Sequence, residues 1–270
     1  MLSTLIITLR EGLEAALIVG ILIAYAVRTE RRHLIKPIWW GVISAIAASL
    51  LAGALLSYTS ASLPDEAEMI FAGSTSIIAV ALVTWMIFWM KRTARNLRDE
   101  LSGKMEKAAL GGTAAIATAA FLATAREGLE TALFIYTNFK TVGAGSSATL
   151  GLIIGFAIAI ALGVAIYRRS VHLNLGKFFT YTGVALIVIA AGVLANGFHE
   201  FQELGWIGGG ESIALDLSPF LHEGNFLEAL LHGTLGLNDK TTALQLGVWV
   251  GYVALITGAY LKPAKVSAQK

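Results

Sequence analysis

Cysteine is absent from this chain of 270 residues, and charged residues are scarce. The absence of cysteine excludes disulfide bonds, iron–sulfur clusters and metal sites built on thiolates. Only 14% of the residues are charged, against about 25% in soluble domains, which leaves too little polar surface to cover a soluble body. The formal net charge of +2 gives no support for nucleic-acid binding. No GxxxxGK(S/T) phosphate loop is present, so the sequence contains no built-in ATPase of that type.

Long apolar runs take the place of the missing charges, and 56% of the residues are hydrophobic. Runs of about 20 apolar residues are long enough to cross about 30 Å of hydrocarbon as a helix. We therefore expect an all-α, polytopic membrane protein with seven transmembrane helices. The first run has no basic residue before it and itself contains charges, so we do not expect a cleavable signal peptide. The predicted spans are 2–27, 38–58, 69–90, 108–137, 149–167, 178–199 and 241–261.

The loops between the predicted spans alternate in charge. Most of the 20 lysines and arginines lie in loops 28–36, 91–107 and 168–177 and after residue 261. The positive-inside rule makes these segments cytoplasmic, which puts the N-terminus outside and the C-terminus in the cytoplasm. Aromatic residues near the cytoplasmic ends of the spans are typical of an interfacial belt. These residues are Trp39, Trp40, Trp85, Trp89 and Tyr260.

Acidic residues gather on the opposite, outer face, where they would attract cations. Two groups there are candidates for an outer-face metal site, although a helix cap or a solvated loop explains them equally well. The first group is Asp65, Glu66 and Glu68, and the second is His199, Glu200 and Glu203.

A charged motif occurs twice inside the apolar runs. The segments TLREGLEAAL at 8–17 and TAREGLETAL at 124–133 are identical at eight of ten positions. The first lies on span 1 and the second on span 4, which the predicted topology orients in opposite directions. Spans 1–3 and 4–6 are therefore predicted to form an inverted repeat with a substrate site at its interface, and span 7 lies outside it. We expect one permease domain over 1–270, with repeat A at about 1–90, repeat B at about 108–199, an outer loop at 200–240 and span 7 at 241–261.

Each motif places two glutamates on one face of a helix, with an arginine beside them. A charge at the bilayer centre costs about 2.5–3.5 kcal/mol, so these side chains must face each other, water or a ligand. Ion pairs of Arg10 with Glu14 and of Arg126 with Glu130 would account for one glutamate in each motif. The two motifs would still carry a net negative charge that protons or a cation must neutralise. Carboxylates without cysteine or a span-centred histidine form an all-oxygen site, which suits Mg²⁺, Ca²⁺, Mn²⁺ or Fe³⁺.

With two REGLE motifs on antiparallel spans, the sequence resembles the oxidase-dependent iron transporter family over essentially its whole length. That family includes the fungal high-affinity iron permeases and the bacterial EfeU-type permeases. The resemblance implies import of iron, expected as Fe³⁺, across a plasma or bacterial inner membrane, with iron as substrate and no cofactor. It also implies an extracytoplasmic iron-oxidising or iron-binding partner protein, and contact with membrane lipid. The metal ligands that it implies are Glu11, Glu14, Glu127 and Glu130, supported by Arg10 and Arg126.

Other functions fit the same residues. The glutamates could serve a transporter of another hard cation such as Mn²⁺, or a proton-coupled carrier. An intramembrane carboxylate di-iron oxidase would draw glutamates and Glu-x-x-His motifs from four helices, whereas only two predicted spans carry acids in their interior. We therefore expect a permease and not an enzyme.

Overall fold

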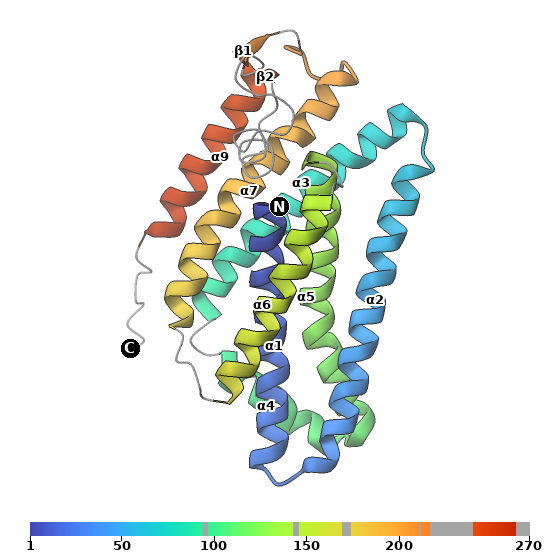
Figure 1. Cartoon of the computed structure of the whole chain (residues 1–270), viewed down its shortest axis with the longest axis vertical. Helices are drawn as coiled ribbons and strands as arrows, with labels where there is room; N and C mark the ends of the chain where they lie inside the picture. Colours follow the sequence, from blue (N-terminus) through green and yellow to red (C-terminus); the bar gives the residue numbers. More distant parts are fainter. Residues whose placement is uncertain (94–96, 143–145, 169–173, 211, 217–239, 263–270) are drawn as a thin grey trace.

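The computed structural model is helical almost throughout, and its long helices lie roughly side by side (Figure 1). Two short strands, β1 (Ile213–Asp216) and β2 (Lys240–Thr242), pair antiparallel near one end of α7 and α9. The sequence predicts no strands, so this small sheet is an addition to the predicted all-α fold. The structure describes residues 1–93, 97–142, 146–168, 174–210, 212–216 and 240–262.

Seven long helices occupy the predicted spans in the described part of the chain. Five of them, α2, α3, α6, α7 and α9, are long and apolar enough to cross a membrane. The other two, α1 and α5, contain the REGLE motifs, whose charges lower their hydropathy. The long helices are α1 (Leu2–Arg28), α2 (Ile35–Ala61), α3 (Asp65–Thr93), α5 (Gly112–Val142), α6 (Ser146–Tyr167), α7 (Leu175–Glu203) and α9 (Ala243–Leu261).

The fourth predicted span begins later than expected because a separate helix precedes it. Helix α4 (Leu97–Leu110) occupies most of the predicted loop 91–107, and a single turn η1 (Arg32–Leu34) lies between α1 and α2. Gly112 has a φ of +80°, a left-handed conformation that glycine adopts without strain, and the chain changes direction there. The predicted start at residue 108 was therefore wrong. Most of the predicted outer loop 200–240 lies outside the described residues.

Each half of the chain packs mainly against helices of the other half. Helix α1 packs mainly against α6, α5 packs mainly against α2, and α3 packs against α7. Small residues allow both close approaches. A Cβ atom at Gly155 of α6 would overlap the Thr8 hydroxyl of α1, and a Cβ atom at Gly128 of α5 would overlap the Ser49 hydroxyl of α2. The motif helices α1 and α5 also contact each other and run in opposite directions (Figure 1).

Helix α1 lies in the middle of the bundle, whereas α2, α6 and α9 expose long apolar faces. Leu13 and Leu22 of α1 are fully buried, while Leu50 of α2, Ile160 of α6 and Leu255 of α9 are 60–74% exposed. Apolar faces of this size would be unfavourable in water and are expected where a helix faces lipid. The fold is therefore that of an integral membrane protein with a charged helix at its centre.

Candidate metal site

The first motif lies midway along α1, where the surrounding helices cover it completely. Arg10, Glu11 and Glu14 are each only 1% exposed. Because α1 continues without a break through the motif, positions 11 and 14 lie one turn apart on the same face. The burial therefore removes from solvent one positive and two negative side chains that lie side by side.

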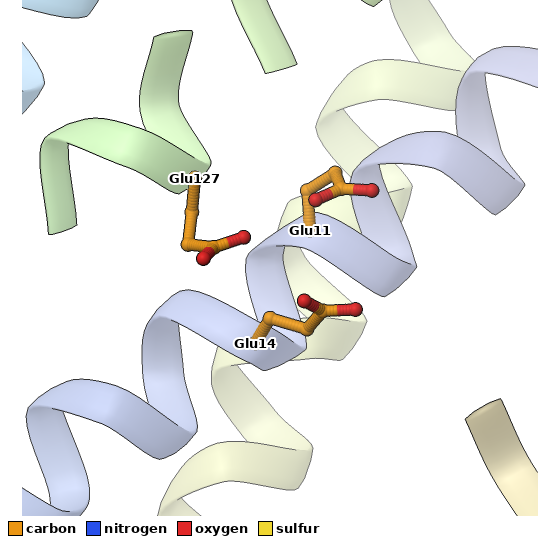
Figure 2. A group of neighbouring side chains, drawn as sticks. All are labelled: Glu11, Glu14 and Glu127. Atoms are coloured by element: carbon orange, nitrogen blue, oxygen red, sulfur yellow. The ribbon is translucent and has the colours of Figure 1, made fainter. Parts of the chain in front are cut away.

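Glu127 of the second motif completes a group of three carboxylates. Glu11, Glu14 and Glu127 each offer an oxygen atom, and these three atoms lie within 4.8 Å of one another. Figure 2 shows Glu127 reaching from α5 toward the two glutamates of α1. Glu127 is 4% exposed, so all three members of this group, which we call the carboxylate triad, are buried. The spacing allows one small cation to contact all three side chains.

Arg10 is the positive charge that touches the triad. Its Nε atom lies 3.1 Å from Glu14 Oε1 and its Nη1 atom lies 3.6 Å from Glu11 Oε1, as ion pairs without the alignment of a hydrogen bond. Its Nη2 atom donates to the Sδ atom of Met86 on α3 at 2.7 Å. The guanidinium group is therefore fixed between two helices, and the triad together with Arg10 carries a formal charge of −2 when the glutamates are ionised.

The triad oxygens have few partners of their own. Among the described residues, neither carboxylate oxygen of Glu11 accepts a hydrogen bond, and Oε2 of Glu127 also lacks a partner. Two unit negative charges 4.8 Å apart repel by about 3–4 kcal/mol at an effective dielectric constant of about 20. Since buried charges also lose their hydration, the site needs a bound cation or protons to be stable.

Arg126, the counterpart of Arg10, lies in a different environment. Its side chain is 29% exposed, and its Nε atom donates to Glu130 Oε1 at 3.0 Å. Its guanidinium group lies 4.0 Å from the ring centroid of Trp89 and 5.3 Å from that of Trp85, both on α3. Glu130 is therefore held by its own arginine and is not among the three glutamates that gather with oxygens within 4.8 Å.

A cavity of about 1190 Å³ lies between α1, α2, α5 and α6 and reaches the triad. Glu11 and Glu127 line its wall. The cavity extends along α5 as far as Lys140 and along α2 as far as Trp39, which lie near opposite ends of the bundle. Most of the lining is apolar, so the carboxylates are the strongest cation-binding groups in it.

The outer-face candidates do not gather in the way that the triad does. Glu68 forms an ion pair with Lys140 of α5 and accepts a hydrogen bond from Ser60 at 3.3 Å. His199 and Glu203 lie one turn apart on α7, with Nε2 and Oε1 3.2 Å apart. Within the described residues, Asp65, Glu66, Glu68, His199, Glu200 and Glu203 do not supply three ligand atoms within 4.8 Å of one another. Their role in metal binding stays a prediction.

Two residues that contact the motif arginines had no role in the predicted site. Met86 contacts Arg10, and Trp89 was assigned to the interfacial belt, whereas its ring lies under Arg126. Both are on α3, three residues apart, and so lie on neighbouring positions of one helix face. A charged motif in an apolar span needs such partners from other helices, but its sequence does not indicate which helix supplies them.

Comparisons with known proteins give a consistent result over nearly the whole chain. Residues 1–264 match the model of the iron permease FTR1 family. The chain is 34% identical over 266 residues to the ferrous iron permease EfeU of Escherichia coli strain UTI89, covering 97% of this chain and 96% of that protein. It is 32% identical to the ferrous iron permease EfeU of Yersinia pestis, covering 97% and 94%. No solved structure matches the chain.

Proposed function

The chain belongs to the iron permease FTR1 family, and on that premise we propose that it imports iron across a membrane through the carboxylate triad. The observation that carries the proposal is the meeting of Glu11, Glu14 and Glu127 within 4.8 Å in the centre of a helical bundle. Hard oxygen ligands of this kind suit iron, magnesium and manganese ions. The relatives bear the name ferrous iron permease, which favours iron among these metals.

The charge of the site favours Fe²⁺ as the transported form. Arg10 neutralises one of the three glutamates, and a divalent ion would neutralise the remaining charge of −2. Fe³⁺, the form expected from the family resemblance, would leave an excess positive charge in a buried site. An uncompensated buried charge is costly, so the ferrous ion is the better match unless a further acid such as Glu130 joins the site.

The membrane potential can drive this import. At 100 mV, inside negative, each positive charge that moves inward gains about 2.3 kcal/mol. A crossing Fe²⁺ would gain about 4.6 kcal/mol, which supports a concentration ratio of about 10³ at 1.4 kcal/mol for each factor of ten. A partner outside the membrane that binds iron would act upstream of this step.

We further propose the seven-span topology with the N-terminus outside and an inverted repeat of α1–α3 and α5–α7. The repeat would relate α1 to α5, α2 to α6 and α3 to α7. The helix packing supports it, because this exchange converts the α1–α6 pair into the α5–α2 pair. The same exchange leaves the α3–α7 pair and the α1–α5 pair unchanged, and both pairs are in contact. An ion site shared by α1 and α5 would then lie at the repeat interface.

Uptake of iron by lipid vesicles that contain the purified protein tests the function. Fe²⁺ under anaerobic reductant, chelated Fe³⁺ and Mn²⁺ are supplied separately, and the initial uptake is measured at an imposed potential. We expect Fe²⁺ uptake in the wild type and its loss in Glu127→Gln, which has nearly the same shape but no charge. Glu106→Gln, which changes an exposed glutamate on α4, is the matched control and keeps wild-type uptake.

Two outcomes would contradict the proposal. Equal uptake by Glu127→Gln and the wild type would remove the triad from the transport path. Preferential uptake of Mn²⁺ over iron would reassign the substrate, and preferential uptake of Fe³⁺ would refute the charge argument for Fe²⁺.

A further inference from the structure

The two motifs share a threonine two residues before the arginine, and the two threonine hydroxyls differ in their hydrogen bonding. Thr8 is fully buried, and its hydroxyl donates to the carbonyl oxygen of Thr4 at 2.8 Å. The same hydroxyl packs against Gly155 of α6. Thr8 is therefore occupied by an intrahelical hydrogen bond and by the close contact between α1 and α6.

Thr124, its counterpart on α5, has no such partner. It is 5% exposed, and among the described residues its hydroxyl makes no hydrogen bond. Most buried hydroxyl groups are hydrogen-bonded, so this one needs a partner that the described residues do not supply, such as a water molecule or an ion. The next threonine along α5, Thr131, follows the usual pattern, because its hydroxyl donates to the carbonyl oxygen of Glu127 at 2.6 Å.

The position of Thr124 places it beside the triad. It precedes Glu127 by three residues in one continuous helix, so the two side chains are neighbours on the same face. Thr124, Glu11 and Glu127 line the same cavity. An unpaired neutral oxygen donor therefore lies one helical turn from a carboxylate that has an unpaired oxygen of its own.

We propose that the Thr124 hydroxyl is a fourth oxygen ligand of the transported cation. This inference rests on the proposed function and adds to the site a residue outside the glutamates and arginines. Iron, magnesium and manganese ions in oxygen sites favour six ligands, whereas one oxygen from each triad glutamate supplies three. A threonine oxygen adds a ligand without adding charge, so the site keeps its formal −2 and holds a divalent ion as a neutral complex.

Three substitutions test the proposal in the vesicle assay with Fe²⁺ under anaerobic reductant. Thr124→Val keeps the shape and removes the hydroxyl, Thr124→Ser keeps the hydroxyl, and Thr8→Val makes the same change at the counterpart position. We expect Thr124→Val to raise the KM for Fe²⁺ by about tenfold, as loss of one interaction with a charged group would. Thr124→Ser and Thr8→Val should keep the wild-type KM, and Thr8→Val should instead lower the thermal stability.

A binding measurement on the solubilised full-length protein separates a ligand from a merely structural role. Fe²⁺ is titrated against a chromogenic chelator, so that affinity is read without transport. Thr124→Val should lose affinity by a similar factor, and Thr124→Ser should restore it. Where Thr124→Val does not fold, Thr124→Ala compared with Thr124→Ser gives the same test.

The proposal for Thr124 can fail while the proposed function stands. Wild-type KM and affinity in Thr124→Val, with uptake still abolished by Glu127→Gln, would overturn only the fourth ligand. Equal defects in Thr124→Ser and Thr124→Val would also overturn it, because the hydroxyl would then not be the cause. A wild-type protein without iron uptake would overturn the proposed function itself.

Discussion

Replacing Arg10 by glutamine should destabilise the protein far more than the same change at Arg126. Arg10 is buried between Glu11 and Glu14, so Arg10→Gln leaves three buried carboxylates and a formal charge of −3 on the triad. Removing one partner of a buried ion pair costs about 3–5 kcal/mol, because the other charge is left without compensation. That is a large part of a net stability of about 5–15 kcal/mol.

Arg126→Gln should lower the stability much less, because the side chain of Arg126 is 29% exposed. An i,i+4 ion pair of this kind is worth about 0.3–0.5 kcal/mol. The contact with Trp89 adds about 0.5–2 kcal/mol as a cation–π interaction. We therefore expect Arg126→Gln to lose roughly 1–2 kcal/mol, which leaves a difference of about 1–4 kcal/mol between the two variants.

Unfolding of the purified protein in mixed micelles, titrated with a denaturing detergent, measures this difference. The buffer contains a metal chelator, because a cation bound to the triad would mask the loss of Arg10. The double variant Arg10→Gln with Glu14→Gln is the internal control, since it removes both members of the pair and restores the formal charge of −2. It should be more stable than Arg10→Gln alone. Equal losses for Arg10→Gln and Arg126→Gln, or no recovery in the double variant, would refute the reasoning.

Further predictions follow from the packing, the site and the topology. Glu130→Gln should retain part of the iron uptake, because this glutamate lies outside the triad; vesicle uptake measures it, and complete loss would place it among the ligands. Trp89→Leu removes the ring under the guanidinium group and should lower stability by about 0.5–2 kcal/mol in micelle unfolding, with no change if the contact is incidental. Gly155→Leu should block folding, seen as loss of the monodisperse peak in size-exclusion chromatography. In this cysteine-free chain, Ser62→Cys should react with an impermeant thiol reagent in intact cells and Ser102→Cys only in opened membranes; the reverse pattern would invert the topology.

The long helices could be predicted from the sequence because the hydrocarbon thickness fixes the length of an apolar run. The sequence did not predict helix α4, because this segment is short and charged and was therefore assigned to the loop 91–107 between two spans. A signal was present, since Leu101 and Met105 lie four residues apart among polar residues and are both buried against α1 and α5. The strands β1 and β2 had no comparable signal. They are stabilised by backbone pairing between segments that are distant in the sequence, and a local sequence pattern cannot predict such pairing.

The repeat predicted four candidate ligands, Glu11, Glu14, Glu127 and Glu130, but it could not predict that only three of them gather. The motifs are nearly identical, so the sequence predicts the same role for Glu14 as for Glu130, and the same role for Arg10 as for Arg126. The structure separates them through their neighbours. The motif of α1 is fully buried, and its arginine must be paired inside the bundle. Helix α5 lies beside α3, and the guanidinium group of its arginine lies 4.0 Å from the ring centroid of Trp89 on α3.

This asymmetry determines where the negative charge of the site lies. If both arginines sat among the four glutamates, the charge of −2 would be spread over four side chains. With Arg126 drawn toward Trp89 and paired with Glu130, that pair is locally neutral, and the excess charge falls on the three glutamates of the triad. A concentrated charge binds a divalent ion more strongly than a spread one, because the attraction rises as the distance falls. If the triad binds the ion as proposed, we expect Trp89 to strengthen that binding without touching the ion, through its contact with Arg126.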